Sequence, residues 1–189
     1  MNIFEIMRVG FTTAMIVGSL ILSTAVQAQQ SKFPPCPTVP VSEWDNCWGA
    51  GDFVNGQTYD GEFKNGKPNG FGTSTWPDGH KYIGYFKDGK MNGQAIYDST
   101  SGERYVGQWR DNRRNGKGTL FWPDGRKYVG EFRDDKFNGR GILYGKDGSI
   151  SQMGIWNDGH LMQATNDNFP TAPPIQQMPQ PLVKSPQQN

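Results

Sequence analysis

The chain repeats itself every 23 residues, and this period constrains its fold more than any other feature. Tyrosine recurs at Tyr59, Tyr82, Tyr105 and Tyr128. Two residues after each tyrosine stands a glycine: Gly61, Gly84, Gly107 and Gly130. Four residues after it stands another ring: Phe63, Phe86, Trp109 and Phe132. Because a period between 20 and 50 residues is typical of stacked arrays, we expect each unit to pack only against its neighbours.

Residues within one unit alternate with a period of two, which predicts β-strands rather than helices. Tyr82, Gly84 and Phe86 lie on one face of such a strand, and Ile83 and Tyr85 lie on the other. A glycine between two rings has no Cβ, so it leaves a slot in which a ring from a neighbouring strand can lie over the backbone. The first half of each unit is therefore a strand with one aromatic face.

Two kinds of turn separate the strands. Asn65-Gly66 and Asp88-Gly89 are typical of tight hairpins, whereas the third and fourth units carry Asn112 and Asp135 at the glycine position; such side chains tolerate a left-handed backbone less well. The second strand is expected to begin at a Gly-x-Gly pair, which is Gly70 and Gly72 in the first unit. It ends at a turn such as Trp76-Pro77-Asp78-Gly79, where proline presets φ and glycine closes a type I turn.

These features predict an all-β fold, an elongated antiparallel ribbon of tandem β-hairpins with no helical domain. We expect full repeats at residues 59–81, 82–104, 105–127 and 128–150. Partial units at 47–58 and 151–161 flank them within an array that spans residues 47–161. Terminal units of a stacked array are expected to be atypical because they cap it.

The pattern resembles the MORN repeat family. Its motif, Tyr-x-Gly-x-(Trp/Phe)-x-x-Gly-x-x-x-Gly-x-Gly and then Asp-Gly before the next Tyr, is repeated from Cys47 to about Leu161. Departures that we expect to loosen single turns or ring positions occur at Ala95, Ser99, Ser101, Asn112, Asp135 and Gly145. The resemblance implies a ribbon of hairpins and a role in protein assembly or phospholipid contact. The chain has no room for a fused lipid kinase domain.

The ends of the chain differ from the array in composition. Residues 1–28 are similar to an export signal: an apolar run from Val9 to Val26 follows Arg8, and Ala28 ends a cleavage site that would leave Gln29 as the mature start. A retained membrane anchor is the alternative. Residues 29–46 form a proline-rich lead-in, and residues 162–189 form a tail rich in proline and glutamine that we expect to be disordered, either a tether, a docking peptide or a solvated leftover. The expected location is periplasmic or secreted.

Cys36 and Cys47 are the only cysteines. In an oxidising compartment a disulfide between them would staple the lead-in to the first strand, and two free thiols are the alternative. A metal site is not expected because His80 and His160 lie far along the chain.

Composition and motifs point away from catalysis and from nucleic acid. The chain carries 19 basic and 18 acidic residues, so its net charge of +1 creates no overall field. His80 occupies a position that holds Glu103, Arg126 and Ser149 in other units, which suggests an interchangeable surface residue. Glu62 and Glu131 alternate with the aromatic face and are expected to point to water. We therefore expect no enzyme activity and no cofactor.

Two surfaces are candidates for binding. The first is the basic row, eight cations at two positions of the first turn: Lys64, Lys67, Lys87, Lys90, Arg110, Arg113, Arg133 and Lys136. Stacked hairpins would align them toward anionic lipid, polysaccharide or an acidic protein. Ordinary solubilising charge is the alternative, and it is favoured because the same turns carry Asp88, Asp111, Asp134 and Asp135, which cancel much of the field. The second is the aromatic and glycine-lined face, some of whose rings are expected to remain exposed as a groove for a protein partner. The favoured function is a non-catalytic scaffold for protein interaction.

Overall fold

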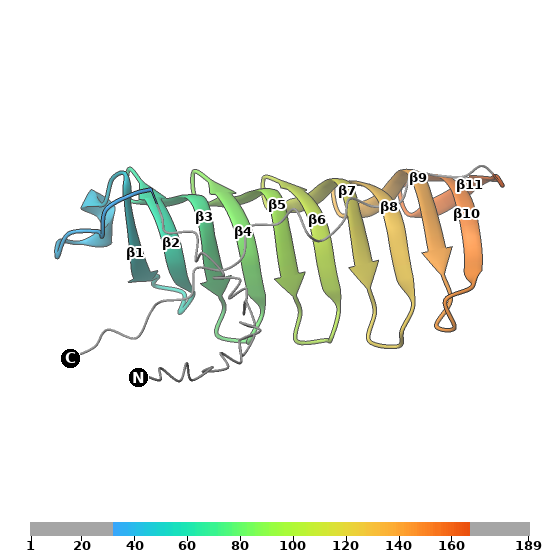
Figure 1. The fold of residues 1–189 in the computed structure, drawn as a ribbon, viewed down its shortest axis with the longest axis horizontal. Helices are drawn as coiled ribbons and strands as arrows, with labels where there is room; N and C mark the ends of the chain where they lie inside the picture. Colours follow the sequence, from blue (N-terminus) through green and yellow to red (C-terminus); the bar gives the residue numbers. More distant parts are fainter. Residues whose placement is uncertain (1–31, 167–189) are drawn as a thin grey trace, which may run out of the picture.

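A computed structural model describes residues 32–166 as one open sheet of eleven strands in chain order, every neighbouring pair antiparallel (Figure 1). This confirms the predicted all-β ribbon. The strands are β1 Cys47–Asp52, β2 Thr58–Lys64, β3 Lys67–Thr75, β4 Lys81–Lys87, β5 Lys90–Asp98, β6 Arg104–Arg110, β7 Arg113–Phe121, β8 Lys127–Arg133, β9 Lys136–Tyr144, β10 Ile150–Asn157 and β11 His160–Ala164. The only helix in the described part is a three-residue 3-10 helix, Val41–Glu43.

The expected export signal at residues 1–28 lies outside the described residues, as does most of the tail, from 167 onward. Within residues 32–166 no helix is long and apolar enough to cross a membrane.

The second strand of each hairpin begins earlier than the sequence suggested. β3 starts at Lys67, directly after the Asn65-Gly66 turn, because Lys64 and Lys67 already face each other across the hairpin. Gly70 lies inside the strand at a positive φ of 107°, which a side chain would make unfavourable. The expectation that the strand begins at the Gly-x-Gly pair is therefore wrong.

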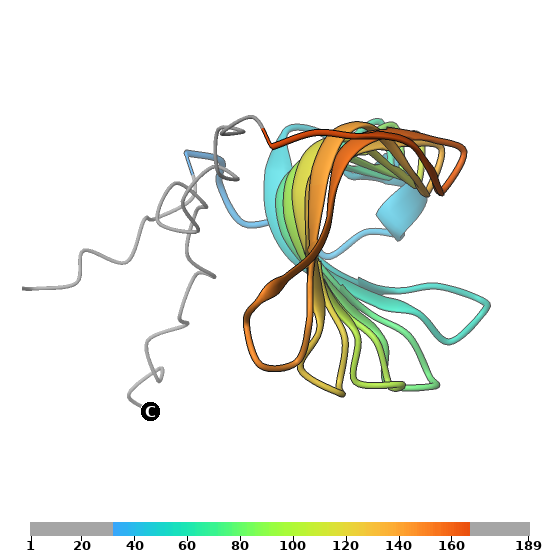
Figure 2. The ribbon, with the colours of Figure 1, turned by 90° about the vertical axis from the view of Figure 1, so that its right-hand side faces the viewer.

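Each hairpin contains a β-bulge that bends both of its strands. The register of β2 against β3 shifts between Gly61 and Phe63, and equivalent shifts recur in the pairs β4–β5, β6–β7 and β8–β9. Bulges bend strands and increase their twist. Figure 2, which looks along the array, shows the upper part of the sheet curling over to one side above the lower turns. We call the concave side of this bend the trough.

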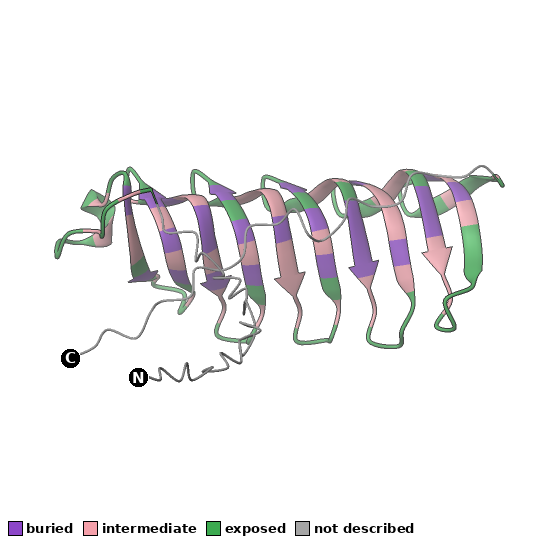
Figure 3. Ribbon diagram, viewed as in Figure 1, coloured by how far each residue is buried: buried purple, intermediate pink, exposed green. Residues whose placement is uncertain are grey.

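The core is a continuous row of rings inside the bend. The eight repeat rings that follow the Tyr-x-Gly-x-(Phe/Trp) pattern are between 0 and 7% exposed. Tyr59 lies 5.1 Å from Phe63 of its own unit and 4.9 Å from Phe86 of the next, and the same edge-to-face contacts continue along the array. Figure 3 shows the resulting buried bands on successive strands. The bend closes over these eight rings, so the exposed aromatic groove that the sequence predicts does not extend along the whole face.

Three of the four repeat tyrosines, Tyr59, Tyr105 and Tyr128, cross two glycines and end at the bulge, whereas Ala95 stands at the second of these positions beside Tyr82. A Cβ on Gly61 of the same strand, or on Gly72 of the next, would collide with the Tyr59 ring. Its hydroxyl donates to the Glu62 carbonyl at 3.1 Å, and Tyr82, Tyr105 and Tyr128 do the same three residues onward. The space left by a glycine is thus filled by a tyrosine ring, which comes from the same strand at Gly61 and from the neighbouring strand at Gly72.

The lead-in closes the first end of the array. A disulfide joins Cys36 to Cys47. Trp44 packs edge-on against Phe63 at 4.8 Å, and its carbonyl accepts the Gly66 N–H at 2.7 Å. At the other end the register of β10 against β9 shifts between Ile150 and Gln152.

Candidate functional site

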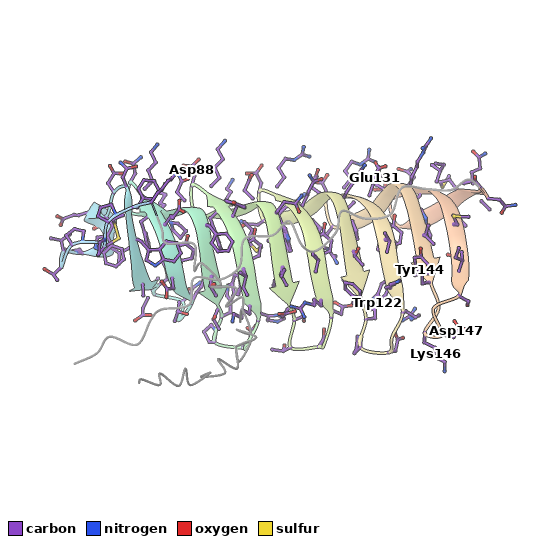
Figure 4. The ribbon with its side chains drawn as sticks, in the orientation of Figure 1. Asp88, Trp122, Glu131, Tyr144, Lys146 and Asp147 are labelled. Carbon is purple, nitrogen blue, oxygen red and sulfur yellow. A yellow bond between two sulfur atoms is a disulfide. The ribbon has the colours of Figure 1, made fainter. Side chains whose placement is uncertain are left out.

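The basic row lies along the upper edge of the sheet, where Figure 4 marks Asp88 among exposed side chains. All eight cations are exposed. Three of them pair with the aspartate of the following turn: Lys90 with Asp111 at 3.5 Å, Arg113 with Asp134 at 3.6 Å and Lys136 with Asp158 at 3.5 Å. Exposed pairs of this kind add little stability, but they neutralise the later part of the row.

The remaining charge of the row lies near its first end. The turn at residues 64–67 has two cations and no acid, the next two turns have two cations and one acid each, and the turn at 133–136 has two of each. Within residues 32–166 no carboxylate pairs with five of the cations: Lys64, Lys67, Lys87, Arg110 and Arg133. Three of the five lie in the first two turns, and Arg133 shares its turn with Asp134 and Asp135. The row is therefore a short basic patch over the first turns rather than a uniform comb.

A cavity of about 460 Å³ lies in the trough over the middle repeats. We call it the groove. Residues from both kinds of turn line it together with core rings: Trp76, Asp78, His80, Met91, Tyr97, Ser99, Glu103, Tyr105, Trp109, Asn112, Arg114, Leu120 and Asp135. Because residues near the upper turns and near the lower turns share one cavity, the bend of the strands is what creates it.

Ser99 explains why the groove lies at this point of the array. It occupies the position of Trp76 and Trp122 in the neighbouring units and closes the same turn, with its N–H bonded to the Glu103 carbonyl at 2.8 Å and its carbonyl accepting the Gly102 N–H at 3.0 Å. Figure 4 marks Trp122 beside the lower turns. The backbone is unchanged at Ser99, and only the indole is missing.

The ring contacts of the two tryptophans show what an indole at position 99 would meet. Trp76 contacts Tyr97 at 6.4 Å, and Trp122 contacts Phe137 at 6.1 Å. Moving these contacts by one repeat places an indole at position 99 against Leu120 and Arg114, both of which line the groove. The groove is therefore the space that a repeated tryptophan would fill.

His80 is part of the groove wall rather than an interchangeable surface residue. Its ring stacks on Tyr97 with centroids 5.6 Å apart, and its Nδ1 lies 2.8 Å from the Tyr97 hydroxyl. Its Nε2 lies 3.4 Å from an Asp78 carboxylate oxygen. Burial raises the pKa of the Tyr97 hydroxyl, and the negative charges of Asp78 and Glu103 raise it further. These contacts hold the His80 ring in place, so that it forms a flat polar part of the groove wall.

Arg114 forms the opposite wall. Its Nε lies 3.2 Å from an Asp135 carboxylate oxygen, and its guanidinium lies over the rings of Tyr105 and Phe132 at 5.8 and 5.7 Å. Trp109 lies at the floor with its indole N–H buried and without an acceptor. Rings, one positive wall and several carboxylates suit the binding of a mixed polar and apolar ligand.

The titratable side chains of the groove contact one another: His80 lies against Tyr97 and Asp78, and Arg114 pairs with Asp135. Both nitrogens of His80 have neighbours in the wall, and Asp78 is largely exposed. No cluster of three or more His, Cys, Asp or Glu side chains within residues 32–166 has the geometry to hold a metal ion. Glu62 is half-buried, and burial raises the pKa of its carboxyl. It packs against Gly70 rather than pointing fully to water.

Sequence reasoning treated Ser99 as a departure that loosens a turn and missed its effect on the trough. The available signal was the row Phe53, Trp76, Ser99, Trp122 and Gly145, in which one small residue stands between two tryptophans. The missing indole at Ser99 can be recognised as a gap only when the side chains of this row are known to point into a shared concavity, which the sequence does not show.

Fold and groove together define the class of protein: an open array of tandem β-hairpins whose bent sheet offers a binding surface. The MORN repeat family model matches residues 59–81, 82–104, 105–125 and 128–150. The chain therefore contains four tandem repeats of the MORN family. Repeats of this family are generally protein- or membrane-binding modules and generally non-catalytic. A comparison with curated proteins finds no match.

Proposed function

We propose that the protein is a non-catalytic scaffold of an exported compartment that binds an extended segment of a partner protein in the groove. The observation that carries this proposal is the gap at Ser99, which leaves aromatic rings of several strands facing a shared cavity. Trp, Tyr and Arg are the residues that most often dominate the energy of protein interfaces, and the groove has all three.

The shape of the site supports an extended segment over a globular partner. A cavity of about 460 Å³, lined by residues from all four full repeats, accommodates several side chains of a single strand of peptide, but no domain. Its walls come from turns of successive units, so a ligand lying along the array would contact equivalent positions in turn.

Photo-crosslinking in the producing cells tests the proposal. A benzoylphenylalanine at position 78, an exposed residue that lines the groove and leaves the gap at Ser99 open, should give one discrete adduct with a second protein, identified by mass spectrometry. The matched control places the same probe at Tyr85, which is 40% exposed and lies on the opposite face of its strand. Equal adducts from both positions, or none from position 78, would reject the groove as the binding site.

The compartment is tested by sequencing the N-terminus of the protein recovered from those cells. Export with cleavage predicts a chain that starts at Gln29. A chain that retains the apolar run from Val9 to Val26 would indicate an anchored protein, and one that remains inside the cell would reject export.

Anionic lipid or polysaccharide is a second candidate ligand, favoured by the unpaired cations of the first turns. Each cation near an anionic surface contributes about 1 kcal/mol, or roughly fivefold in affinity. Changing Lys64, Lys67 and Lys87 to glutamine should therefore weaken co-sedimentation with anionic vesicles about 100-fold. The same change at the paired Lys90, Arg113 and Lys136 is the control and should weaken it much less. Equal losses, or binding that ignores salt, would exclude the basic patch.

A further inference from the structure

We propose that the groove is a polyproline-recognition site and that its occupant in this protein is the chain's own C-terminal segment, residues 170–186. This inference goes beyond the proposed function: it uses the same groove and the same preference for an extended segment, but it names a segment of the chain itself as the occupant. The argument combines the chemistry of the groove, the position of the groove in the sheet, and the composition and length of the chain beyond residue 166.

The position of the groove rules out strand addition. β4, β5, β6 and β7 are each hydrogen-bonded to a neighbouring strand on both sides. The backbone under the groove therefore has no free strand edge with which a ligand strand could pair. A ligand must therefore bind through its side chains and through single hydrogen bonds. A polyproline II helix does this, since it has no internal hydrogen bonds and presents carbonyls and apolar rings.

The walls of the groove match such a ligand. Trp76 and Tyr97 are half-buried, and their rings meet edge to face at 6.4 Å. Proline-rich segments dock between aromatic side chains of this kind. Within residues 32–166 no acceptor bonds the Trp76 indole N–H, so it is available to a ligand carbonyl.

Residues 170–186 have the composition that these walls would recognise. Pro170 and Pro173 form a Pro-x-x-Pro pair, and Pro174, Pro179, Pro181 and Pro186 follow. Lys184 is the only charged side chain in residues 168–189. Asp78 and Glu103 at the rim of the groove supply the opposite charge.

The segment is long enough to reach. Five strand spacings separate β11 from β6, a distance of about 24 Å. The 22 residues from Thr165 to Pro186 span about 70 Å in polyproline II geometry. This length allows the chain to pass the end of the array and lie along the trough.

The first experiment uses the full purified chain with benzoylphenylalanine at position 78, which lines the groove without filling the gap at Ser99, mixed as equal parts of isotope-labelled and unlabelled protein. The expected adduct joins position 78 to a peptide from residues 167–189, with both parts carrying the same isotope label. A mixed-label adduct would assign the groove to the tail of a second copy, and the absence of any tail adduct would reject the tail as occupant. The probe at position 85 should give no tail adduct.

A second experiment places the probe in the tail at Ile175 and fills the groove. Ser99→Trp should reduce crosslinking between the tail and the array at least tenfold. Gly145→Trp is the matched control, because it restores the same row of tryptophans two units away, and it should leave crosslinking unchanged. Replacing Pro173 and Pro174 with alanine should reduce the crosslink about as strongly as Ser99→Trp. Equal crosslinking in all variants would overturn the proposal.

These outcomes separate the two hypotheses. If cells give an adduct with a partner but purified protein gives no tail adduct, the proposed function stands and the tail is rejected as the occupant of the groove. A tail adduct in purified protein without any partner in cells keeps the tail and rejects the partner-binding role.

Discussion

Asn112 and Asp135 show how a departure from a repeat can strengthen it. Both adopt positive φ values, 67° and 70°, where most units have glycine. The Asn112 side-chain oxygen accepts the Met91 N–H at 2.7 Å, and that of Asp135 accepts the Arg114 N–H at 3.0 Å. Each bond joins a turn to the unit before it. The expectation that these residues loosen their turns is wrong, because a side chain that glycine lacks compensates for the backbone conformation.

Replacing Asn112 tests this compensation. Asn112→Ala loses the bond to Met91 and places a Cβ at positive φ without an amide, and we expect it to cost about 2 kcal/mol of unfolding free energy. Asn112→Gly loses only the bond and should cost about 1 kcal/mol. Urea unfolding of the two variants and the parent measures both values. A glycine variant more stable than the parent would contradict the account.

Gly107 is required for space rather than for backbone freedom. Its φ is ordinary, but an added Cβ would lie 2.6 Å from the Gly118 Cα and 2.5 Å from the Tyr105 hydroxyl. Gly107→Ala should therefore lower the free energy of unfolding by about 3 kcal/mol or more. This is at or above the upper end of the range of about 1–3 kcal/mol that is typical of overpacking, because the backbone of Gly118 cannot easily move aside. Gly145→Ala is the control, because its Cβ would meet only the side chains of Asp147 and Ser149 and a nearby carbonyl. Similar midpoints in thermal unfolding would refute this explanation.

At the scale of elements, the lead-in acts as the first cap. The disulfide ties it to β1, and Gly49 lies under Trp44 and Cys36, where a Cβ would lie about 3 Å from both. Without the cap, the rings of Tyr59 and Phe63 would lose their cover at the end of the array. A terminal unit of a stacked array needs such closure.

Removing the disulfide should loosen the first end only. Closing a loop of this size is worth about 2–3 kcal/mol in the chain-entropy account. With Cys36 and Cys47 both changed to serine, hydrogen exchange should become faster in β1 and β2 and stay unchanged in β8 and β9. Uniformly faster exchange along the sheet would mean that the array unfolds as one unit, not from its end.

The sequence predicted the hairpins and their order because the two determinants are local: alternation of residues and turn chemistry. It did not predict the start of β3 or the burial of the repeat rings. Alternation shows that Tyr82, Gly84 and Phe86 share a face, but whether that face closes depends on bulges that need a positive φ on the opposite strand. The groove was missed for the same reason, since Ser99 lines a cavity only when bent strands bring both kinds of turn together.

At the scale of the whole molecule, the four repeat tyrosines link stability to alkaline pH. Burial raises the pKa of each hydroxyl above its ordinary value of 10.0. Above pH 10 the unfolded chain releases these protons while the folded chain keeps them, so folding stability is full below pH 10 and falls as pH rises toward the raised pKa values.

The expected slope follows from that count. Each tyrosine contributes about 1.4 kcal/mol per pH unit, and four together give about 5.5 kcal/mol per pH unit. Denaturant unfolding measured between pH 9 and pH 11.5 should show a flat region followed by a steep loss. Tyr128→Phe should reduce the slope by about a quarter. A stability that falls steadily from neutral pH would contradict this origin.

Deleting residues 82–104 tests both the modular fold and the groove. The deletion joins Lys81 to Tyr105, which keeps the order lysine, tyrosine, hydrophobic residue and glycine that begins a unit, so strand register is preserved. It also brings Trp76 and Trp122 into adjacent units and removes the gap at Ser99.

The shorter ribbon should still fold, with a free energy of unfolding lower by about 1–3 kcal/mol, because each residue contributes about 0.05–0.15 kcal/mol. Duplicating residues 105–127 should raise it by a similar amount and leave the groove in place. Circular dichroism and urea unfolding measure the fold, and crosslinking from the tail probe measures the groove. The deletion should abolish that crosslink while the duplication retains it, since the first closes the row of indoles and the second leaves its gap open.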